Sequence, residues 1–206
     1  MNFEYTTDRL VMRVCHDDMA EQVLDFYDKN REYFDCYEMT RADNFYTVPY
    51  QKATLKLEYD EMIKNKMIRF YLFKKDEVAD IKKDYEVFKE LDIVRKKMIG
   101  SVSLSQIRYG SYRDAMFGYK LDHDYEGNGY AFEACKKLME IAFDELELHR
   151  LEAYIMPSNK RSINLIKKLG FSYEGIKRSS CEVNHVYEDH ELYAFVKGMN
   201  KDEEVD

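Results

Sequence analysis

The chain has 206 residues, of which 45% are hydrophobic and 35% are charged, a balance typical of a soluble globular protein with one domain. Its formal net charge of -8 argues against a nucleic-acid partner, because binding to the phosphate backbone rests on Lys and Arg. The same charge would suit a cationic substrate, although solubility alone accounts for it. No apolar run is long enough to cross a bilayer, so we expect no membrane partner.

The N-terminus and the cysteines indicate a cytoplasmic protein, and we expect no bound metal. The opening residues, MNFEYTTDRL, lack the basic start and the apolar stretch of a signal peptide. His185 and His190 lie among acids and are more typical of surface residues than of metal ligands, because a metal site needs three or four converging groups. The cysteines are scattered without a CxxC pair, so we expect reduced thiols at Cys15, Cys36, Cys135 and Cys181.

The N-terminal part of the chain predicts one strand and two helices. Residues 9–14, RLVMRV, alternate apolar and charged side chains, as a half-buried strand does. Asp17 and Asp18 then offer an N-cap for a first helix. Pro49 marks the start of a second helix, whose apolar residues recur at helical spacing.

Three strands and an inserted segment make up the middle of the chain. Residues 68–75, 98–107 and 115–122 predict strands, because they are rich in β-branched and aromatic side chains. Between the first two, apolar side chains recur every three to four positions over residues 76–95. This spacing predicts an extra amphipathic helix, whose role is packing, with a lid or a dimer contact as alternatives.

The C-terminal half alternates helices and strands. Residues 124–138, DYEGNGYAFEACKKL, place two glycines directly before an amphipathic helix. Residues 150–156 predict a strand, and Ser158 or Asn159 can cap the helix that follows it and stops at Gly170.

Two last strands, at residues 171–180 and 191–197, complete the predicted elements. No long linker or internal repeat divides the chain. We therefore predict a single α+β domain over residues 1–198, with a mixed but mostly antiparallel central sheet flanked by helices. Residues 199–206 are expected to form a flexible tail.

The glycine pair lies where a strand passes into a helix, and this arrangement can bind an anion. The first N–H groups of a helix have no partner inside the helix, and the helix dipole adds positive potential. Gly127 and Gly129 would let these groups face a phosphate without Cβ atoms in the way. The alternative is a tight turn that binds nothing. The dinucleotide-binding fingerprint is excluded because Phe132 stands in place of its third glycine.

Two stretches resemble the GNAT acetyltransferases, and more narrowly the RimJ/RimL branch, which acetylates protein N-terminal amines. They are residues 119–143, YKLDHDYEGNGYAFEACKKLMEIAF, and residues 148–178, LHRLEAYIMPSNKRSINLIKKLGFSYEGIKR. TTDRLVMR near the start and IGSVSLSQI in the middle also resemble strands of that branch. The resemblance extends from Thr7 to about Val196, apart from the inserted segment, and implies the GNAT fold.

The resemblance also implies an enzyme that uses acetyl-CoA as the donor and no metal. A substrate amine would attack the thioester directly. The implied acceptor is a protein N-terminal α-amine. The alternatives are a polyamine, an amino-sugar or another small amine, or a GNAT-fold module that binds CoA without turnover. Whether the protein is a monomer or a homodimer stays open.

The family's diphosphate-binding loop corresponds to residues 126–131 of this chain. Glu126 stands where the family has Gln or Arg, and a carboxylate beside a diphosphate is unfavourable unless it points away. We therefore expect backbone N–H groups to bind the diphosphate. Asn159 matches the residue that holds the pantetheine arm, with a helix cap as its alternative role. The implied coenzyme contacts are Gly118, Tyr119, Lys120, Leu121, Glu126, Gly127, Asn128, Gly129, Tyr130, Ala131, Asn159 and Ser162.

Three residues are candidates for the chemistry. Ser162 matches a serine of the RimJ/RimL branch and would donate a proton to the leaving thiol or bond it; a plain helix-start serine is the alternative. The backbone N–H of Tyr119 (or that of Leu121) would stabilise the oxyanion. Glu38 lies in a segment that resembles the acceptor pocket and is a candidate base. The other candidate bases are Glu174 and Asp189, and each of these acids could instead be a surface residue.

Overall fold

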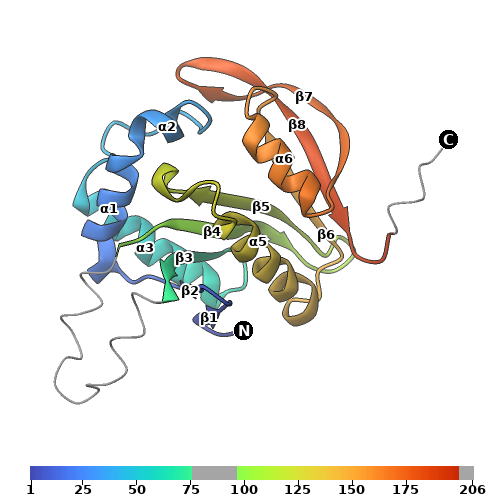
Figure 1. Ribbon diagram of the computed structural model, residues 1–206, viewed down its shortest axis with the longest axis horizontal. Helices are drawn as coiled ribbons and strands as arrows, with labels where there is room; N and C mark the ends of the chain where they lie inside the picture. Colours follow the sequence, from blue (N-terminus) through green and yellow to red (C-terminus); the bar gives the residue numbers. More distant parts are fainter. Residues whose placement is uncertain (76–96, 200–206) are drawn as a thin grey trace.

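The computed structural model describes residues 1–75 and 97–199 (Figure 1). The predicted inserted helix at residues 76–95 therefore lies outside the described residues, as does the chain from residue 200 onward. The described chain has the predicted α+β architecture, with one mixed sheet and helices on both of its faces.

In the described residues, the sheet has eight strands in the order β1-β2-β3-β4-β5-β6-β8-β7. Neighbouring strands are antiparallel except β5 and β6, which are parallel. The strands are β1 (Glu4–Thr6), β2 (Leu10–Arg13), β3 (Ile68–Lys74), β4 (Gly100–Arg108), β5 (Asp114–Leu121), β6 (Arg150–Ile155), β7 (Ser172–Val183) and β8 (Val186–Val196).

The described helices connect these strands. The α-helices are α1 (Ala20–Lys29), α2 (Arg31–Asp35), α3 (Val48–Ile63), α5 (Tyr130–Glu140) and α6 (Lys160–Lys168). Shorter pieces are the 3-10 turns η1 (Asp17–Met19) and η3 (His123–Tyr125) and a π-helical turn, η4 (Ile141–Glu145), that continues α5. None of these helices is both long and apolar enough to span a bilayer.

Different helices cover the two faces of the sheet. On β3, Phe70 and Leu72 belong to one buried cluster and Tyr71 and Phe73 to another, because side chains alternate between the faces of a strand. Side chains of α5 and α6 belong to the first cluster. Side chains of α1, α2 and one side of α3 belong to the second. Each fully buried side chain, such as Leu138 of α5, contributes roughly 1.5–3 kcal/mol to folding.

Most helix ends follow the predicted signals. Pro49 lies in the first turn of α3, and Gly170 follows α6 with a φ of 97°. Asn159 rather than Ser158 caps α6 through its side chain. The predicted cap at Asp17-Asp18 is wrong, because both residues lie inside η1 and no side chain caps that turn.

Two short elements escape the sequence patterns. Strand β1 has only three residues, and its pairing with β2 supplies its regular structure. Helix α2 has five residues and no side-chain cap, which is too short for a helical period to be visible in sequence. It begins directly after Asn30, which is the C-cap residue of α1.

Candidate functional site

Strands β5 and β6 separate part of the way along the sheet. They pair only from Asp114 to Met116 on β5 and from Arg150 to Glu152 on β6. Beyond these residues both strands continue, but no ladder joins them. Each strand therefore has backbone groups along this gap that the other strand does not bond.

The backbone N–H groups of β5 alternate between β4 and the gap. The N–H of Asp122, directly after β5, donates to the carbonyl of Ile99 beside β4 at 2.8 Å. Because successive backbone groups of a strand point to opposite edges, the N–H groups of Tyr119 and Leu121 face the gap. Those of the even-numbered residues face β4. Two amides of β5 are therefore available to a group bound in the gap.

The glycine loop between η3 and α5 is shaped by left-handed backbone. Gly127 and Gly129 have φ values of 75° and 80°, which non-glycine residues adopt only at a cost. Gly129 is the N-cap of α5, and no side chain caps the first N–H groups of that helix. The side chain of Asn128 bonds the carbonyls of Tyr125 and Glu126 instead. The start of α5 is thus left open to an anion.

Arg9, the residue directly before β2, holds this loop, a role that the sequence did not suggest. Its guanidinium donates to the carbonyl of Asn128 at 2.8 Å and to the carboxylate of Glu133 at 2.7 Å. The hydroxyl of Thr7 donates to the same carboxylate at 2.5 Å. Burial would raise the pKa of Glu133, but the bonds from Thr7 and Arg9 outweigh it and lower that pKa.

A cavity of about 690 Å³ opens between the glycine loop, α2 and α6. We name it the glycine-loop cavity; its lining includes Tyr119, Gly127, Gly129, Asn159 and Ser162. The Oδ1 of Asn159 accepts from the Ser162 N–H at 3.1 Å, so Asn159 plays the cap role that was its alternative. Within the described residues, the Nδ2 of Asn159 and the Oγ of Ser162 have no hydrogen-bond partner and stay available for a ligand.

The side chain of Tyr119 ties β5 to α6. Its hydroxyl donates to the backbone carbonyl of Ser162 at 3.0 Å, and burial raises its pKa well above the ordinary tyrosine value. This hydroxyl is therefore a positioning group for the start of α6. Any role of Tyr119 toward an oxyanion stays with its backbone N–H.

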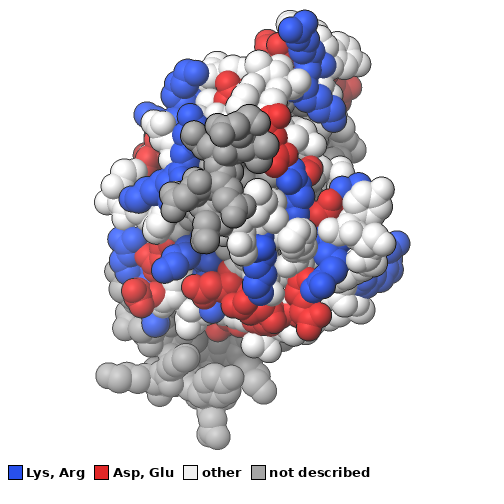
Figure 2. All heavy atoms as spheres, turned by 90° about the vertical axis from the view of Figure 1, so that its right-hand side faces the viewer, with Lys and Arg blue, Asp and Glu red and all other residues white. Residues whose placement is uncertain are grey.

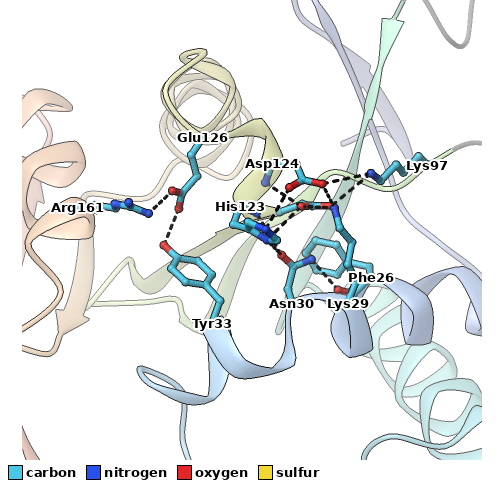
Figure 3. A network of polar contacts seen from close by, with 10 residues as sticks. Phe26, Lys29, Asn30, Tyr33, Lys97, His123, Asp124, Glu126 and Arg161 are labelled. Carbon is cyan, nitrogen blue, oxygen red and sulfur yellow. Dashed lines mark hydrogen bonds and ion pairs between the residues drawn. The ribbon is translucent and has the colours of Figure 1, made fainter.

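Glu126 is bound by two side chains from other elements. The hydroxyl of Tyr33, from α2, donates to Glu126 at 2.6 Å, and the guanidinium of Arg161, from α6, forms an ion pair with it (Figure 3). Burial and the Glu126 carboxylate raise the pKa of Tyr33. All three residues line the glycine-loop cavity. The negative charge of Glu126 is thus compensated, although it stays beside the open start of α5.

A second network fixes the turn before the glycines (Figure 3). The ammonium of Lys29, from α1, donates to both oxygens of Asp122 at 2.6 and 2.7 Å and also pairs with Asp124. Asp122 is only 1% exposed. The Oδ1 of Asn30 accepts from the backbone N–H of His123 at 3.1 Å. Helix α1 therefore sets the position of η3.

A second cavity, of about 480 Å³, lies on the opposite face of the sheet. Met116 and Glu152 are register partners that share this face, and both line the cavity together with Tyr154 of β6 and His190 of β8. We name it the β8 cavity. Tyr37 and Glu38, which follow α2, line both cavities.

Glu38, a candidate base, lines both cavities, and its carboxylate is paired. Its carboxylate lies 2.9 Å from the Lys120 ammonium. Burial pushes the pKa of Glu38 upward, but Lys120, Arg41 and Arg69 outweigh burial and lower it. Glu38 is therefore a weakly basic carboxylate.

The other candidate bases lie apart from the two cavities. Glu174 forms an ion pair with Arg150, and Asp189 accepts a hydrogen bond from the backbone N–H of Ser179 at 2.7 Å. Neither belongs to the described lining of the β8 cavity. The expectation for His190 is wrong, because the side chain is 6% exposed and lines that cavity.

The charges on the visible surface do not form one patch. In Figure 2, Lys and Arg side chains alternate with Asp and Glu over the part of this face that is drawn in colour. The four cysteines, all in the described chain, are free.

The described residues fit a coenzyme with a diphosphate and an extended arm. The open N–H groups at the start of α5 suit the anionic diphosphate, and the gap-facing N–H groups of β5 suit an amide-containing arm. The coenzyme contacts predicted from the sequence remain predictions. Arg9, Tyr33 and Arg161 were missed because their partners are distant in sequence.

Known proteins are similar to this chain in sequence and in fold. Residues 9–172 match the Acetyltransferase (GNAT) domain. A probable N-acetyltransferase, YjcK of Bacillus subtilis (strain 168), is 37% identical over 185 residues, which cover 90% of this chain and 91% of the relative.

Two further relatives act on a ribosomal protein by name. The [ribosomal protein uS5]-alanine N-acetyltransferase of Escherichia coli (strain K12) is 29% identical over 189 residues, covering 92% of this chain and 88% of the relative. The crystal structure of ribosomal-protein-S5-alanine acetyltransferase from Vibrio fischeri superposes with a TM-score of 0.82 at 24% identity, covering 96% of this chain and 98% of that chain.

Proposed function

This chain belongs to the GNAT family of N-acetyltransferases, and from that premise we propose that it acetylates the N-terminal α-amine of a protein. The donor is acetyl-CoA, which supplies an activated acetyl thioester. The observation that carries the proposal is the gap between β5 and β6. The glycine-loop cavity approaches these strands from one face of the sheet, and the β8 cavity approaches them from the other. Tyr37 and Glu38 line both cavities.

The residues around the gap have distinct roles in this proposal. The N–H groups at the start of α5 bind the diphosphate, and the Nδ2 of Asn159 bonds the arm. The N–H groups of Tyr119 and Leu121 bond groups in the gap, and preorganised donors of this kind stabilise a developing oxyanion. The Oγ of Ser162 bonds the departing sulfur. Holding donor and acceptor at one gap supplies the proximity that the reaction needs.

The β8 cavity favours a peptide over a polyamine. A polyamine needs unpaired carboxylates, but the three carboxylates in the described lining each have a cationic partner. Glu38 pairs with Lys120, Asp114 with Arg108 and Glu152 with Arg150. Because the charges are already compensated, the cavity suits an acceptor with a single amine and a polar backbone. The uS5-alanine relative supports the same choice.

An acetyl-transfer assay tests the proposal. Lysine-free peptides beginning with Ala, Ser or Met are compared with the same peptides blocked by an N-formyl group, with spermidine and with glucosamine. Thiol release and mass spectrometry measure the transfer. We expect an acetylated α-amine on at least one free peptide, no product from the blocked peptides, and a kcat/KM at least about tenfold lower for the small amines.

Two results would contradict the proposal. Turnover of spermidine or glucosamine without turnover of any peptide would make the protein a small-molecule enzyme. Tight binding of acetyl-CoA without thiol release from any acceptor would make it a binding module.

A further inference from the structure

His190 is a buried, titratable side chain beside the proposed reaction gap. It lies on β8, shares a sheet face with Tyr154 and Glu152 of β6, and lines the β8 cavity. Its side chain is 6% exposed, and no role assigned above uses it. A histidine in such a place is either a structural hydrogen-bonding residue or a proton acceptor.

The hydrogen bonds of His190 favour one tautomer. Its Nδ1 lies 3.2 Å from the backbone carbonyl of Glu188 and 2.9 Å from the Oγ of Ser180. A carbonyl oxygen can only accept, so both contacts are satisfied together when Nδ1 carries the proton and donates to the Glu188 carbonyl and the Ser180 hydroxyl. The lone pair of the neutral ring is then on Nε2.

Nothing in the described chain occupies that lone pair in the ring plane. The Sγ of Cys181 lies 3.6 Å from Nε2 and 3.9 Å from Nδ1. A sulfur in line with the Nε2 lone pair would be much farther from Nδ1, so the near-equal distances put Sγ off the axis of that lone pair. No nitrogen or oxygen of a described residue bonds Nε2, which leaves it for a ligand in the cavity.

The charged groups around the ring come from four parts of the chain. Lys177 on β7 is the register partner of His190, and Cys181 lies on the same strand. Glu188 is two residues away on β8, Glu152 lies on β6, and Glu38 borders the cavity from the segment after α2. Burial, outweighing the Lys177 ammonium, raises the pKa of the Cys181 thiol, so that neighbour stays neutral.

We propose that His190 is the general base of the acetyl transfer, a role that rests on the proposed function. Nε2 takes one proton from the acceptor ammonium, directly or through one water. The neutral amine then forms a C–N bond to the acetyl carbon, and the C–S bond breaks. The second amine proton leaves with the thiolate, so the products are the acetylated amine, the thiol and a protonated His190 that returns its proton to solvent.

His190 suits this task better than the acids near the cavity. Glu38 is ion-paired and its pKa is lowered, which weakens it as a base. Asp114 and Glu152 each pair with an arginine. An imidazole accepts protons near neutral pH, where proton transfer by a positioned base contributes roughly 100- to 10,000-fold to rate.

The test compares His190→Asn with the wild-type protein. The asparagine amide can still donate to the Glu188 carbonyl, so the structural bond survives while the base is lost. At neutral pH we expect kcat to fall about 100-fold or more, with unchanged affinity for CoA and an unchanged melting temperature. The acidic limb of the kcat–pH profile should disappear.

An acceptor with a weakly basic amine separates a lost base from a damaged pocket. A peptide that begins with a hydrazide is already neutral at neutral pH, so it needs no base before attack. We expect His190→Asn to lose less than about threefold with this acceptor, against about 100-fold with the α-amine. Equal losses with both acceptors would overturn the proposal.

Glu38→Gln is the matched control. Suppose that Glu38→Gln loses about 100-fold with the α-amine and less than about threefold with the hydrazide, while His190→Asn keeps wild-type rates and pH dependence. Glu38 is then the base, and His190 is structural. Either result leaves the proposed function intact, because the wild-type protein still acetylates the peptide. Wild-type protein that acetylates no acceptor overturns the proposed function and this proposal with it.

Discussion

Among single residues, Glu126 puts a carboxylate at the glycine-loop cavity, in a position where the resembled family has Gln or Arg. Tyr33 and Arg161 hold this carboxylate, so the charge is compensated in the free protein. A bound diphosphate would compete with Glu126 for Arg161. We therefore expect Glu126 to weaken the binding of an anionic coenzyme without blocking it.

The first prediction follows from this competition. Replacing Glu126→Gln removes one negative charge beside the diphosphate and frees Arg161, so the Kd for CoA should fall about 5- to 10-fold. Calorimetric titration at low and high salt measures it, and the gain should shrink at high salt. Glu147→Gln, an exposed and remote change, should leave the Kd unchanged. Weaker binding by Glu126→Gln would show that Glu126 contributes to the site.

Lys29 is the second informative residue, because it compensates the buried Asp122. Lys29→Met leaves that carboxylate without its nearest cation and should lower the free energy of unfolding by about 3 kcal/mol. Lys64→Met removes an exposed ion pair to Glu61 and should change it by less than about 0.5 kcal/mol. Urea unfolding measures both. Equal effects would mean that the Lys29 network is no more than surface charge.

The pH dependence of this difference has a definite sign. Burial would lower the pKa of Lys29, but the hydrogen bonds to Asp122 and Asp124 outweigh burial and raise it above the ordinary value. Its contribution is therefore complete below the unfolded lysine pKa of about 10.4 and is lost as pH rises further. The stability gap between wild type and Lys29→Met should stay constant from neutral pH to about pH 10 and shrink above it.

Among the elements, the glycine loop and α5 decide whether the turn binds an anion or only connects a strand to a helix. Gly127 has a positive φ, and a Cβ there would meet nothing within 4 Å. Gly110, in the β4–β5 turn, has the same two properties. These two glycines therefore form a matched pair. Substitution should cost a similar amount of stability at both, but only Gly127 lies in the loop proposed to bind an anion.

The third prediction uses that pair. Gly127→Ala and Gly110→Ala should each lower stability by about 1 kcal/mol, because alanine is strained at positive φ. Only Gly127→Ala should also weaken CoA binding, by about tenfold or more, since it alone disturbs the open N–H groups of α5. Thermal unfolding and titration measure the two effects. Matching Kd values for the two variants would favour the simple turn.

For the molecule as a whole, the elements with strong local patterns were predictable and the contacts between them were not. The alternation in β2, the apolar face of α5 and the end of α6 at Gly170 are visible in sequence. Strand β1 depends on its pairing with β2, and α2 is shorter than a helical period can reveal. The burial of His190 depends on a partner strand, so its acidic neighbours in sequence were misleading.

The site shows the same division. The glycine loop and the capping role of Asn159 follow from residues close in sequence. The bridge from Tyr33 through Glu126 to Arg161 joins three elements that only the folded chain brings together. That Glu38 lies near the acceptor stays a prediction. Glu38 borders both cavities, and its ion pair with Lys120 depends on how the segment after α2 packs against β5, which the sequence does not reveal.

The most direct test of the whole arrangement is a nitrogen–proton correlation spectrum recorded while CoA is added. The account predicts that the amide signals of Gly127, Gly129 and Tyr130 shift most, with smaller shifts at Tyr119 and Leu121, while Gly110 stays unchanged. Saturating CoA that moves none of the glycine-loop amides, or that moves signals elsewhere on the molecule, would contradict it.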